Sequence, residues 1–225
     1  MPVRILYITA TLTEADTLQR IRERLAITED SDNFEFSSLV SGIGSMATAW
    51  NMNHWIKLNG KPDIAINAGI AGSFRDELIP GDVVLPLSDC FADSGIEDGN
   101  DFFTLSEAGL ITADEFPYKN GLLYADTSYI NKIRHIVKPV RAITVNTATG
   151  SETTRNKLIK KFNPDIETME GATFFYICSR EKIPFLAVRA ISNKIELRNK
   201  NNWNIPLALN NLSDKIIDVL LTLQR

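Results

Sequence analysis

The feature that most constrains the fold is a nearly continuous apolar run, FLAVRAIS, at residues 185–192. A half-exposed strand alternates apolar with polar residues, whereas a run this apolar is typical of a strand covered on both faces. Residues 166–170 read as a shorter strand, and Gly171 and Ala172 begin an apolar helix between the two runs. The stretch 166–193 therefore predicts a strand, a helix and a second strand of one parallel sheet.

The rest of the chain repeats this alternation of strand and helix patterns. Residues 45–56 read as a helix, Leu18, Ile21 and Leu25 recur at helical spacing, and residues 207–225 form an amphipathic closing helix. Alternating strands and helices predict an α/β domain with a largely parallel sheet. The other strand-like runs lie at residues 3–9, 34–44, 62–74, 81–87 and 141–151.

The patterns break up between Ser88 and Gly121. Loops this long inside a compact domain are usually functional or disordered. Apolar side chains, among them Phe91, Phe102 and Phe103, argue against disorder. We therefore expect this segment to have a defined structure.

Length, charge and cysteine content bound the class of protein. With 225 residues, 44 % of them hydrophobic, the chain can bury the core of one large domain. A net charge of −4 argues against nucleic acid or a membrane surface as a partner. PVRILYITA has the size of a strand rather than of a signal peptide. Two cysteines, and two histidines without ligand spacing, predict a reduced, cytoplasmic protein without a metal site.

Two polar side chains, Glu170 and Asn193, are predicted to follow the two strands of the 166–193 unit. In an open parallel sheet, the carboxyl ends of the strands line the crevice where ligands bind. A carboxylate there can hold hydroxyl groups, and an amide can read one edge of a flat heterocycle. Each residue has a simpler interpretation, since Glu favours a helix start and Asn favours a turn. Their occurrence at both strand ends of one unit favours a ligand site.

The motif M-E-G-A at residues 169–172, with V-R-A-I-S-N at residues 188–193, resembles the nucleoside phosphorylase and nucleosidase superfamily. The chain is most similar to the methylthioadenosine/adenosylhomocysteine nucleosidases, which typically carry Asp where this chain has Asn193. That Asn and the tail ELRNKNNWNIPLA resemble the futalosine hydrolases of menaquinone biosynthesis, which release hypoxanthine. The resemblance implies purine nucleosidase activity and one three-layer α/β/α domain over residues 1–225, with a mixed, mostly parallel central sheet.

The resemblance also implies roles for single residues. Glu14 stands where the family carries a catalytic Glu that positions and deprotonates the attacking water, although a charge favouring a helix start is a simpler interpretation. Met169 would pack on the ribose, and Glu170 would accept hydrogen bonds from its hydroxyl groups. Asn193, the second catalytic candidate, would contact N7 and O6 of a 6-oxopurine.

Two loops resemble segments that line the base and the ribose in the family. The first includes Ile70 and Gly72, with Ile70 at a position where the family has Ser. The second includes Thr149 and Gly150, and it lacks the aromatic ring that the family stacks on the base. Another aromatic side chain, or backbone amides, would then carry that part of the recognition.

Futalosine carries a benzoate on its 5′ side, so a cation is expected to hold that carboxylate. The candidates are Arg75, Lys194 and Arg198. In the family, the segment equivalent to residues 88–121 covers the 5′ end of the nucleoside and takes part in a dimer contact. The resemblance therefore implies a homodimer or higher homo-oligomer, and it implies no cofactor.

Several functions stay open at this point. The superfamily's phosphorylases hold phosphate with a Gly-rich loop and Arg near residue 14, and the lack of such a loop favours water as the nucleophile. A phosphorylase and a methylthioadenosine-type nucleosidase remain alternatives. A non-catalytic purine-binding domain would require Glu14, Glu170 and Asn193 to be unrelated. A dinucleotide enzyme is disfavoured, because no G-x-G-x-x-G follows the first strand.

Overall fold

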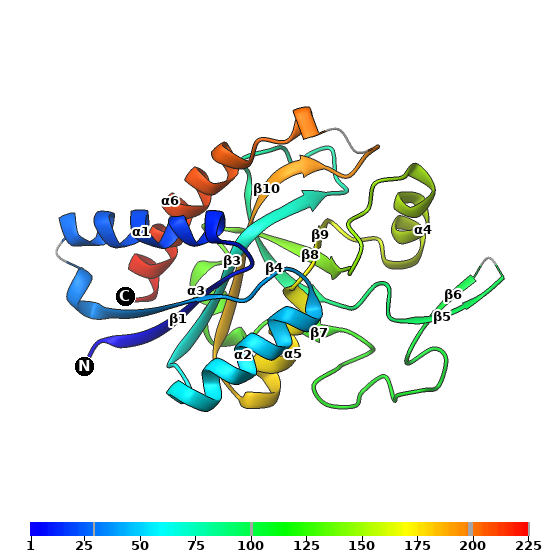
Figure 1. The fold of residues 1–225 in the computed structure, drawn as a ribbon, viewed down its shortest axis with the longest axis horizontal. Coiled ribbons are helices and arrows are strands. Elements are labelled where there is room, and N and C mark those ends of the chain that lie inside the picture. The colour runs from blue at the N-terminus through cyan, green and yellow to red at the C-terminus, as the bar shows by residue number, and fades with distance from the viewer. Residues whose placement is uncertain (29, 100, 198–199, 225) are drawn as a thin grey trace.

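The strands lie where the sequence patterns predict them. The computed structural model describes residues 1–28, 30–99, 101–197 and 200–224 (Figure 1). Every predicted strand is present there, and three short strands are added between residues 95 and 124. The strands are β1 (Val3–Thr9), β2 (Phe34–Val40), β3 (Ile64–Ser73), β4 (Val83–Asp89), β5 (Gly95–Asp98), β6 (Asp101–Thr104), β7 (Leu123–Tyr124), β8 (Lys138–Thr144), β9 (Ile166–Thr168) and β10 (Phe185–Lys194).

Six α-helices connect these strands within the described residues. The first begins with a capping box, in which Thr11 and Glu14 each accept a hydrogen bond from the other's backbone N–H. The last begins with Asn204 as its cap, followed by a proline in its first turn. No helix in the described ranges is both long enough and apolar enough to cross a membrane. The helices are α1 (Leu12–Ile27), α2 (Ser45–Asn59), α3 (Thr127–Ile133), α4 (Glu152–Phe162), α5 (Gly171–Glu181) and α6 (Ile205–Leu223).

The apolar run of residues 185–192 forms the centre of the sheet. Its strand, β10, pairs in parallel with β3 and antiparallel with β4. Every residue of the run is buried, including Arg189. The prediction of a strand covered on both faces is therefore confirmed.

The sheet is mixed and mostly parallel, as the resemblance implies. The prediction that both strands of the 166–193 unit run in parallel is wrong, because β9 pairs antiparallel with β3 whereas β10 pairs in parallel with it. The strand order of the sheet is β10-β4-β8-β9-β3-β1-β2, with β7 beside β4, and β10 also pairs with β3. That last pairing closes the strands from β10 to β3 into a ring. Because a closed ring leaves no free edge, the strands that carry the cavity described below are held on both sides.

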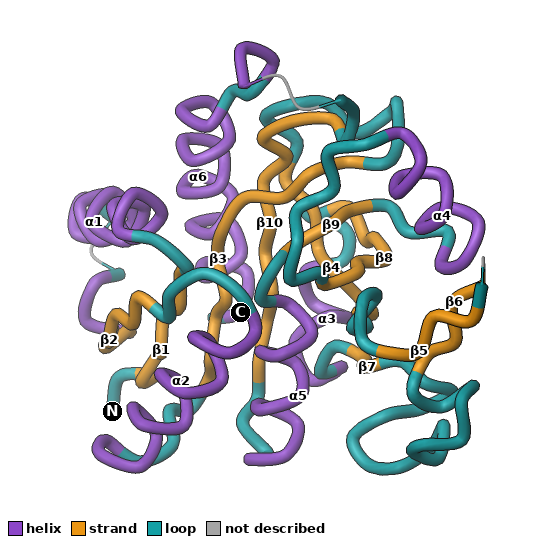
Figure 2. Tube along the Cα trace, turned by 45° about the vertical axis from the view of Figure 1, so that its right-hand side comes forward, coloured by secondary structure: helices purple, strands orange, loops and turns teal. Residues whose placement is uncertain are grey.

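Helices cover the two faces of this sheet. Leu186 and Val188 of β10 pack with α1 and α6 in one core cluster, whereas Phe185 and Ala187 pack with α2 and α5 in another. Successive residues of a strand point to opposite faces, so β10 supplies both clusters. Figures 1 and 2 show these two helix pairs on opposite sides of the strands, which gives the expected three layers.

The segment between residues 88 and 121 has a defined structure at its described residues, as expected. It contains the antiparallel β5–β6 hairpin, which extends away from the central sheet (Figures 1 and 2). Phe102 of the hairpin packs edge-on against Phe162 of α4, with ring centroids 6.3 Å apart. Lys161 of α4 pairs with Glu107 at 2.6 Å. Apolar and ionic contacts together hold the hairpin against α4.

Candidate active site

A cavity of about 480 Å³ lies where the ends of β1, β3, β9 and β10 meet. The starts of α1 and α6 and the loops before α2 and α4 complete its wall. The structure thus brings together residues from distant parts of the chain that the sequence analysis singled out. The predicted residues that line this cavity are Glu14, Ile70, Gly72, Thr149, Met169, Glu170 and Asn193.

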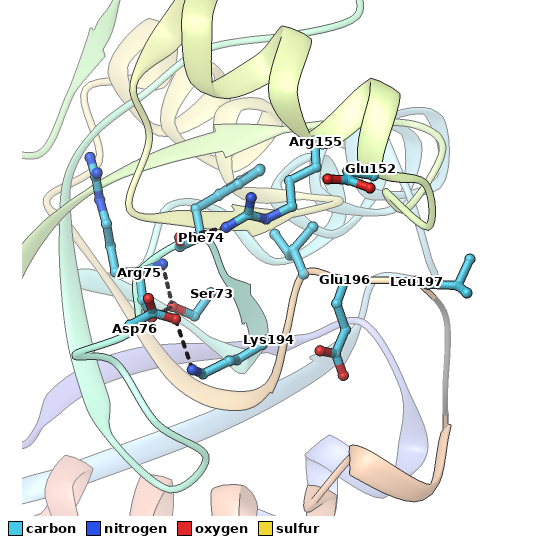
Figure 3. Close-up of a pocket in the computed structure, with 10 residues that line it drawn as sticks. Ser73, Phe74, Arg75, Asp76, Glu152, Arg155, Lys194, Glu196 and Leu197 are labelled. Atoms are coloured by element: carbon cyan, nitrogen blue, oxygen red, sulfur yellow. Dashed lines mark hydrogen bonds and ion pairs between the residues drawn. The ribbon is translucent and has the colours of Figure 1, made fainter.

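The other predicted residues are not brought to this cavity. Gly150 follows a lining residue but is not itself in the wall among the described residues. Arg75 and Lys194 line a separate cavity of about 390 Å³, shown in Figure 3. Arg198 lies outside the described residues.

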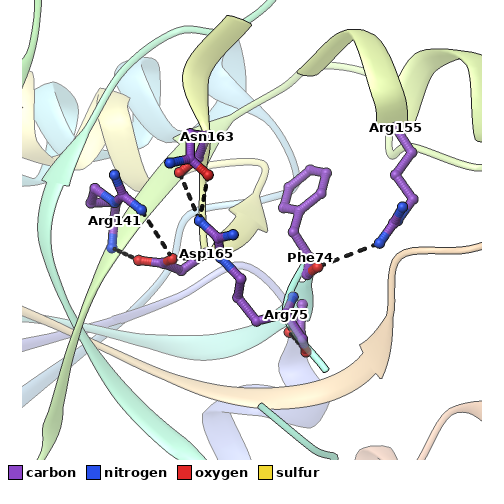
Figure 4. A network of polar contacts seen from close by, with 7 residues as sticks. Phe74, Arg75, Arg141, Arg155, Asn163 and Asp165 are labelled. Carbon is purple, nitrogen blue, oxygen red and sulfur yellow. Dashed lines mark hydrogen bonds and ion pairs between the residues drawn. The ribbon is translucent and has the colours of Figure 1, made fainter. Parts of the chain in front are cut away.

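Both predicted cations in the wall of the separate cavity, Arg75 and Lys194, have partners in the chain. The Arg75 guanidinium pairs with Asp165 at 2.8 Å and donates to the Asn163 side chain at 2.7 Å (Figure 4). Lys194 pairs with Asp76 at 2.9 Å (Figure 3). Neither residue is in the wall of the cavity that contains Glu14, because ion pairs hold Arg75 and Lys194 at the separate cavity.

The Glu14 carboxylate is fixed by four hydrogen bonds. Oε2 accepts from the backbone N–H of Ala10 and Thr11, both at 3.0 Å, and from the Thr11 hydroxyl at 3.1 Å. Oε1 accepts from the Ile70 N–H at 3.0 Å. A Cβ at Gly69 would lie 2.7 Å from Oε1, so any other residue there would displace the carboxylate. Glu14 therefore starts a helix and also lines the cavity, and Oε1 keeps acceptor capacity for a further donor.

Glu170 is a second buried carboxylate of the wall, directly before α5. Its Oε1 accepts from the Gly44 N–H at 2.9 Å. Burial raises the pKa of Glu170, and the Gly44 N–H and the charge of Arg189 oppose that rise. A carboxylate held in this way is an effective acceptor for ligand hydroxyl groups.

Arg189 is a buried cation among these carboxylates that the sequence analysis did not assign to the site. Its guanidinium donates to the Asn67 carbonyl at 2.7 Å and also to the Asn67 side-chain oxygen. Burial lowers its pKa, and the charges of Glu170, Glu14 and Asp89 oppose that fall. The single Arg within the apolar run was the signal in the sequence, since a buried charge requires compensation.

Asp89, at the end of β4, is a further buried carboxyl group that the sequence analysis missed. It accepts from the Thr144 hydroxyl at 3.0 Å. Burial raises its pKa to about 7, more than the Thr144 hydrogen bond lowers it. Asp89 does not line the cavity, so it acts on the site through its charge.

Asn193 lies within β10, whereas the sequence predicted that it follows the strand. The strand continues to Lys194, and its register with β3 shifts by one residue at Ser192, so that Asn193 pairs with Gly72. The Ser192 hydroxyl donates to Asn193 Oδ1 at 2.7 Å, and Nδ2 donates to the Lys194 carbonyl at 2.9 Å. The amide is therefore oriented before any ligand binds.

Two more side chains of the wall were not predicted. Glu167 of β9 is buried and accepts from the N–H and the hydroxyl of Thr149, at 2.9 and 2.5 Å. Trp203, just before α6, supplies an aromatic ring to the wall. The sequence analysis left open which aromatic residue replaces the one missing near Thr149, and Trp203 is a candidate on geometric grounds.

Among the described residues, no cluster of His, Cys, Asp or Glu side chains is arranged to hold a metal ion. The described part of the cavity wall contains three glutamates and neither Lys nor Arg. This wall is therefore suited to neutral ligands that donate hydrogen bonds.

Comparison with known proteins agrees with this architecture. The family model described as the phosphorylase superfamily matches residues 7–224. A futalosine hydrolase of Streptomyces coelicolor is 29 % identical over 184 residues, covering 79 % of this chain and 75 % of that protein. A 5′-methylthioadenosine/S-adenosylhomocysteine nucleosidase of Buchnera aphidicola is 27 % identical over 204 residues, covering 83 % and 79 %.

Solved structures show the same fold. The Neisseria meningitidis 5′-methylthioadenosine/S-adenosylhomocysteine nucleosidase bound to methylthio-immucillin-A has a TM-score of 0.77 and 18 % identity, covering 96 % of this chain and 98 % of that one. The native futalosine hydrolase of Helicobacter pylori has a TM-score of 0.76 and 16 % identity, covering 99 % and 97 %.

Asp89 should make the stability of the protein depend on pH. Its carboxyl group titrates at about 7 when folded and near 3.9 in an unfolded chain. Between these values the folded state binds more protons, so the free energy of unfolding should fall as pH rises from about 4 to about 7. Asp89→Asn should flatten that fall in urea denaturation series, whereas Asp16→Asn, at an exposed position, should leave it unchanged. An unaltered slope in Asp89→Asn would contradict the assignment.

Proposed function

The chain belongs to the phosphorylase superfamily, and we propose that it is a purine nucleosidase that hydrolyses futalosine to dehypoxanthine futalosine and hypoxanthine. One observation carries this proposal. Glu14, Glu170 and Asn193, which come from three separate parts of the chain, line a single cavity. The three side chains match the three chemical tasks of cleaving an N-glycosidic bond.

Those tasks follow from the transition state. The sugar acquires oxocarbenium character as the bond to the base breaks. Negative charge moves onto the leaving purine, so a donor must face it. Water must be held and deprotonated on the opposite side, and the ribose must be fixed so that its C1′ meets that water.

Glu14 is suited to hold and deprotonate the water. Three donors occupy Oε2, whereas among the described residues Oε1 accepts only from the Ile70 N–H. The remaining acceptor site of Oε1 would take the water proton. Because the carboxylate is already fixed, it needs no rearrangement when the water attacks.

Glu170 and Met169 are suited to bind the ribose. The second oxygen of Glu170 would accept from the sugar hydroxyl groups while Gly44 holds the first. Met169 supplies an apolar surface to the same wall. The loop residues Ile70, Gly72, Thr149 and Gly150 would line the ribose and the base, with only the first three in the described wall.

Asn193 is suited to a 6-oxopurine. Its amide has a donor, the NH₂ group, and an acceptor, the carbonyl oxygen. The Ser192 hydroxyl donates to that oxygen and so fixes the orientation of the amide. The NH₂ group would donate a hydrogen bond to O6, and the carbonyl would accept a hydrogen bond from protonated N7. This contact stabilises the leaving base as charge builds up on it.

Water is favoured over phosphate as the nucleophile by the charge of the wall. Three glutamates and no described cation line the cavity, and a phosphate dianion would be repelled by them. A phosphorylase is therefore the weaker proposal. For the same reason the 5′ carboxylate of futalosine would extend beyond this wall, and Arg75 and Lys194 could reach it only after leaving their present partners.

A methylthioadenosine-type nucleosidase is the second candidate, favoured by the relatives named above. Chromatographic identification of the base released from futalosine, inosine and methylthioadenosine, each with and without phosphate, would separate the candidates. We expect hypoxanthine from futalosine, without a requirement for phosphate. Release of adenine from methylthioadenosine alone would favour the second candidate, and no release from any of the three would favour a non-catalytic domain.

We also propose that the protein forms a homodimer or higher homo-oligomer in the cytoplasm. Ile43 lines the cavity and is exposed, and Met46 and Trp50 extend an exposed apolar stripe along α2. Apolar stripes at helical spacing commonly mark protein interfaces. A second chain on α2 would enclose the open side of the cavity.

Replacing Glu14 tests the nucleophilic step. Glu14→Gln keeps the size of the side chain but removes the base, so kcat should fall by at least about 10²-fold. Steady-state kinetics with futalosine, together with the melting temperature, would separate this loss from unfolding. Asp16→Asn, in the same helix but exposed, should keep wild-type kcat. Near-normal turnover by Glu14→Gln would remove Glu14 from the mechanism.

Replacing Asn193 tests recognition of position 6. An ionised Asp facing O6 would set lone pair against lone pair, and an unmatched buried polar contact costs about 1–3 kcal/mol. Asn193→Asp should therefore lower kcat/KM for futalosine relative to its 6-amino analogue by roughly 5- to 150-fold. The measurement is kcat/KM for both substrates in both proteins. If the ratio stayed constant, Asn193 would not read position 6.

A further inference from the structure

The cavity contains a third buried carboxylate, Glu167, for which cleavage of the bond requires no role. From its position we propose that Glu167 determines the choice of base by accepting the N1–H of a 6-oxopurine. This inference rests on the proposed function and assigns a specificity determinant to the same site. Glu167 and Asn193 would then both form hydrogen bonds to the same edge of the base.

The strand register places these two side chains on either side of Gly72. In β3, Gly72 pairs with Asn193 of β10 on one side and with Glu167 of β9 on the other. Neighbouring strands lie about 4.8 Å apart, so the two outer Cα atoms are on the order of 10 Å apart. Both outer side chains line the cavity, and the middle position has no side chain. The result is a slot with a glycine floor, an amide at one side and a carboxylate at the other.

Gly72 is constrained by its surroundings. A Cβ there would lie 2.8 Å from Ile195 Cγ1 and 3.5 Å from Asn193 Nδ2. A side chain would therefore collide with Ile195 and fill the space beside the amide. The open floor between Glu167 and Asn193 leaves room for a flat ring.

The hydrogen bonds of Glu167 leave acceptor capacity on both oxygens. Oε1 accepts from the Thr149 N–H at 2.9 Å, and Oε2 accepts from the Thr149 hydroxyl at 2.5 Å. A carboxylate has about four acceptor sites, so these two bonds leave about two. Burial raises the pKa of Glu167 more than the Thr149 hydrogen bonds lower it. A ligand that donates to these free acceptor sites would stabilise the ionised carboxylate, which burial disfavours.

A 6-oxopurine supplies that donor in the right place. Its O6 accepts and the neighbouring N1–H donates, whereas a 6-aminopurine has a donor at position 6 and an acceptor at N1. The amide of Asn193 can donate to O6, and the carboxylate of Glu167 can accept from N1–H. With a 6-aminopurine, the N1 lone pair would face the carboxylate. The two residues thus select the same class of base by independent contacts.

Glu167 also anchors the loop that carries Thr149, and a purely structural role would have a different signature. Loss of an anchor disturbs the whole cavity, so it should lower kcat/KM for 6-oxo and 6-amino substrates alike. Loss of a residue that recognises the base changes the ratio between the two kcat/KM values. Glu167→Gln separates the two roles, because its amide can still bond to Thr149 while its NH₂ group can donate to N1.

The experiment measures kcat/KM of wild type, Glu167→Gln and Thr149→Val for futalosine and for its 6-amino analogue. Glu167→Gln should shift the ratio toward the 6-amino substrate by roughly 5- to 150-fold, the effect of one unmatched polar contact. Thr149→Val removes one anchoring bond but keeps the carboxylate, so it should lower both values with little change in their ratio. Inhibition constants for hypoxanthine and adenine should shift in Glu167→Gln in the same direction as the substrate ratio.

An equal loss for both substrates in Glu167→Gln would overturn the inference and leave Glu167 as an anchor, with the proposed function intact. Equal ratio changes in Glu167→Gln and Thr149→Val would also overturn it, because loop position would then explain the selection. Failure of the wild type to cleave either nucleoside would overturn the proposed function itself, and this assignment with it.

Discussion

The site depends on one buried positive charge and the carboxylates around it. Arg189 lies inside the central strand, and its guanidinium donates to Asn67. The negative charges of Glu170, Glu14 and Asp89 raise the pKa of this guanidinium, against the lowering effect of burial. Burying one charge without compensation costs several kcal/mol. The carboxylates therefore compensate Arg189 and Arg189 compensates them. This mutual dependence requires β3, β4, β9 and β10 to meet closely, as the closed ring of strands ensures, with β1 paired beside β3.

The same arrangement favours hydrolysis on physical grounds. Backbone N–H groups hold the carboxylates of the wall. The Gly44 N–H donates to Glu170, and the Ile70 N–H donates to Glu14. Backbone donors cannot move away as charge develops, so the acceptors stay aligned with a ligand. A neutral water and a neutral ribose suit such a wall, whereas an anion would need cations that its described residues lack.

Sequence patterns were sufficient for the order of the elements and for several wall residues. The run at residues 185–192 predicted the central strand, because burial on both faces leaves a continuous apolar pattern. Glu167 was missed because pairing across β3 brings it beside Gly72, and register between distant strands cannot be read from local spacing. Lys194 was chosen because it directly follows Asn193, yet its ion pair with Asp76 turns it away from the cavity, and an ion pair with Asp165 does the same for Arg75.

The central claim is that water, held by Glu14, attacks C1′ of the bound nucleoside. Turnover of futalosine in phosphate-free H₂¹⁸O, followed by mass spectrometry of the sugar product, tests it most directly. We expect one ¹⁸O atom at C1′ of the dehypoxanthine product, with unlabelled hypoxanthine and no increase in rate when phosphate is added. A phosphorylated sugar that forms only when phosphate is present, without ¹⁸O at C1′, would contradict it.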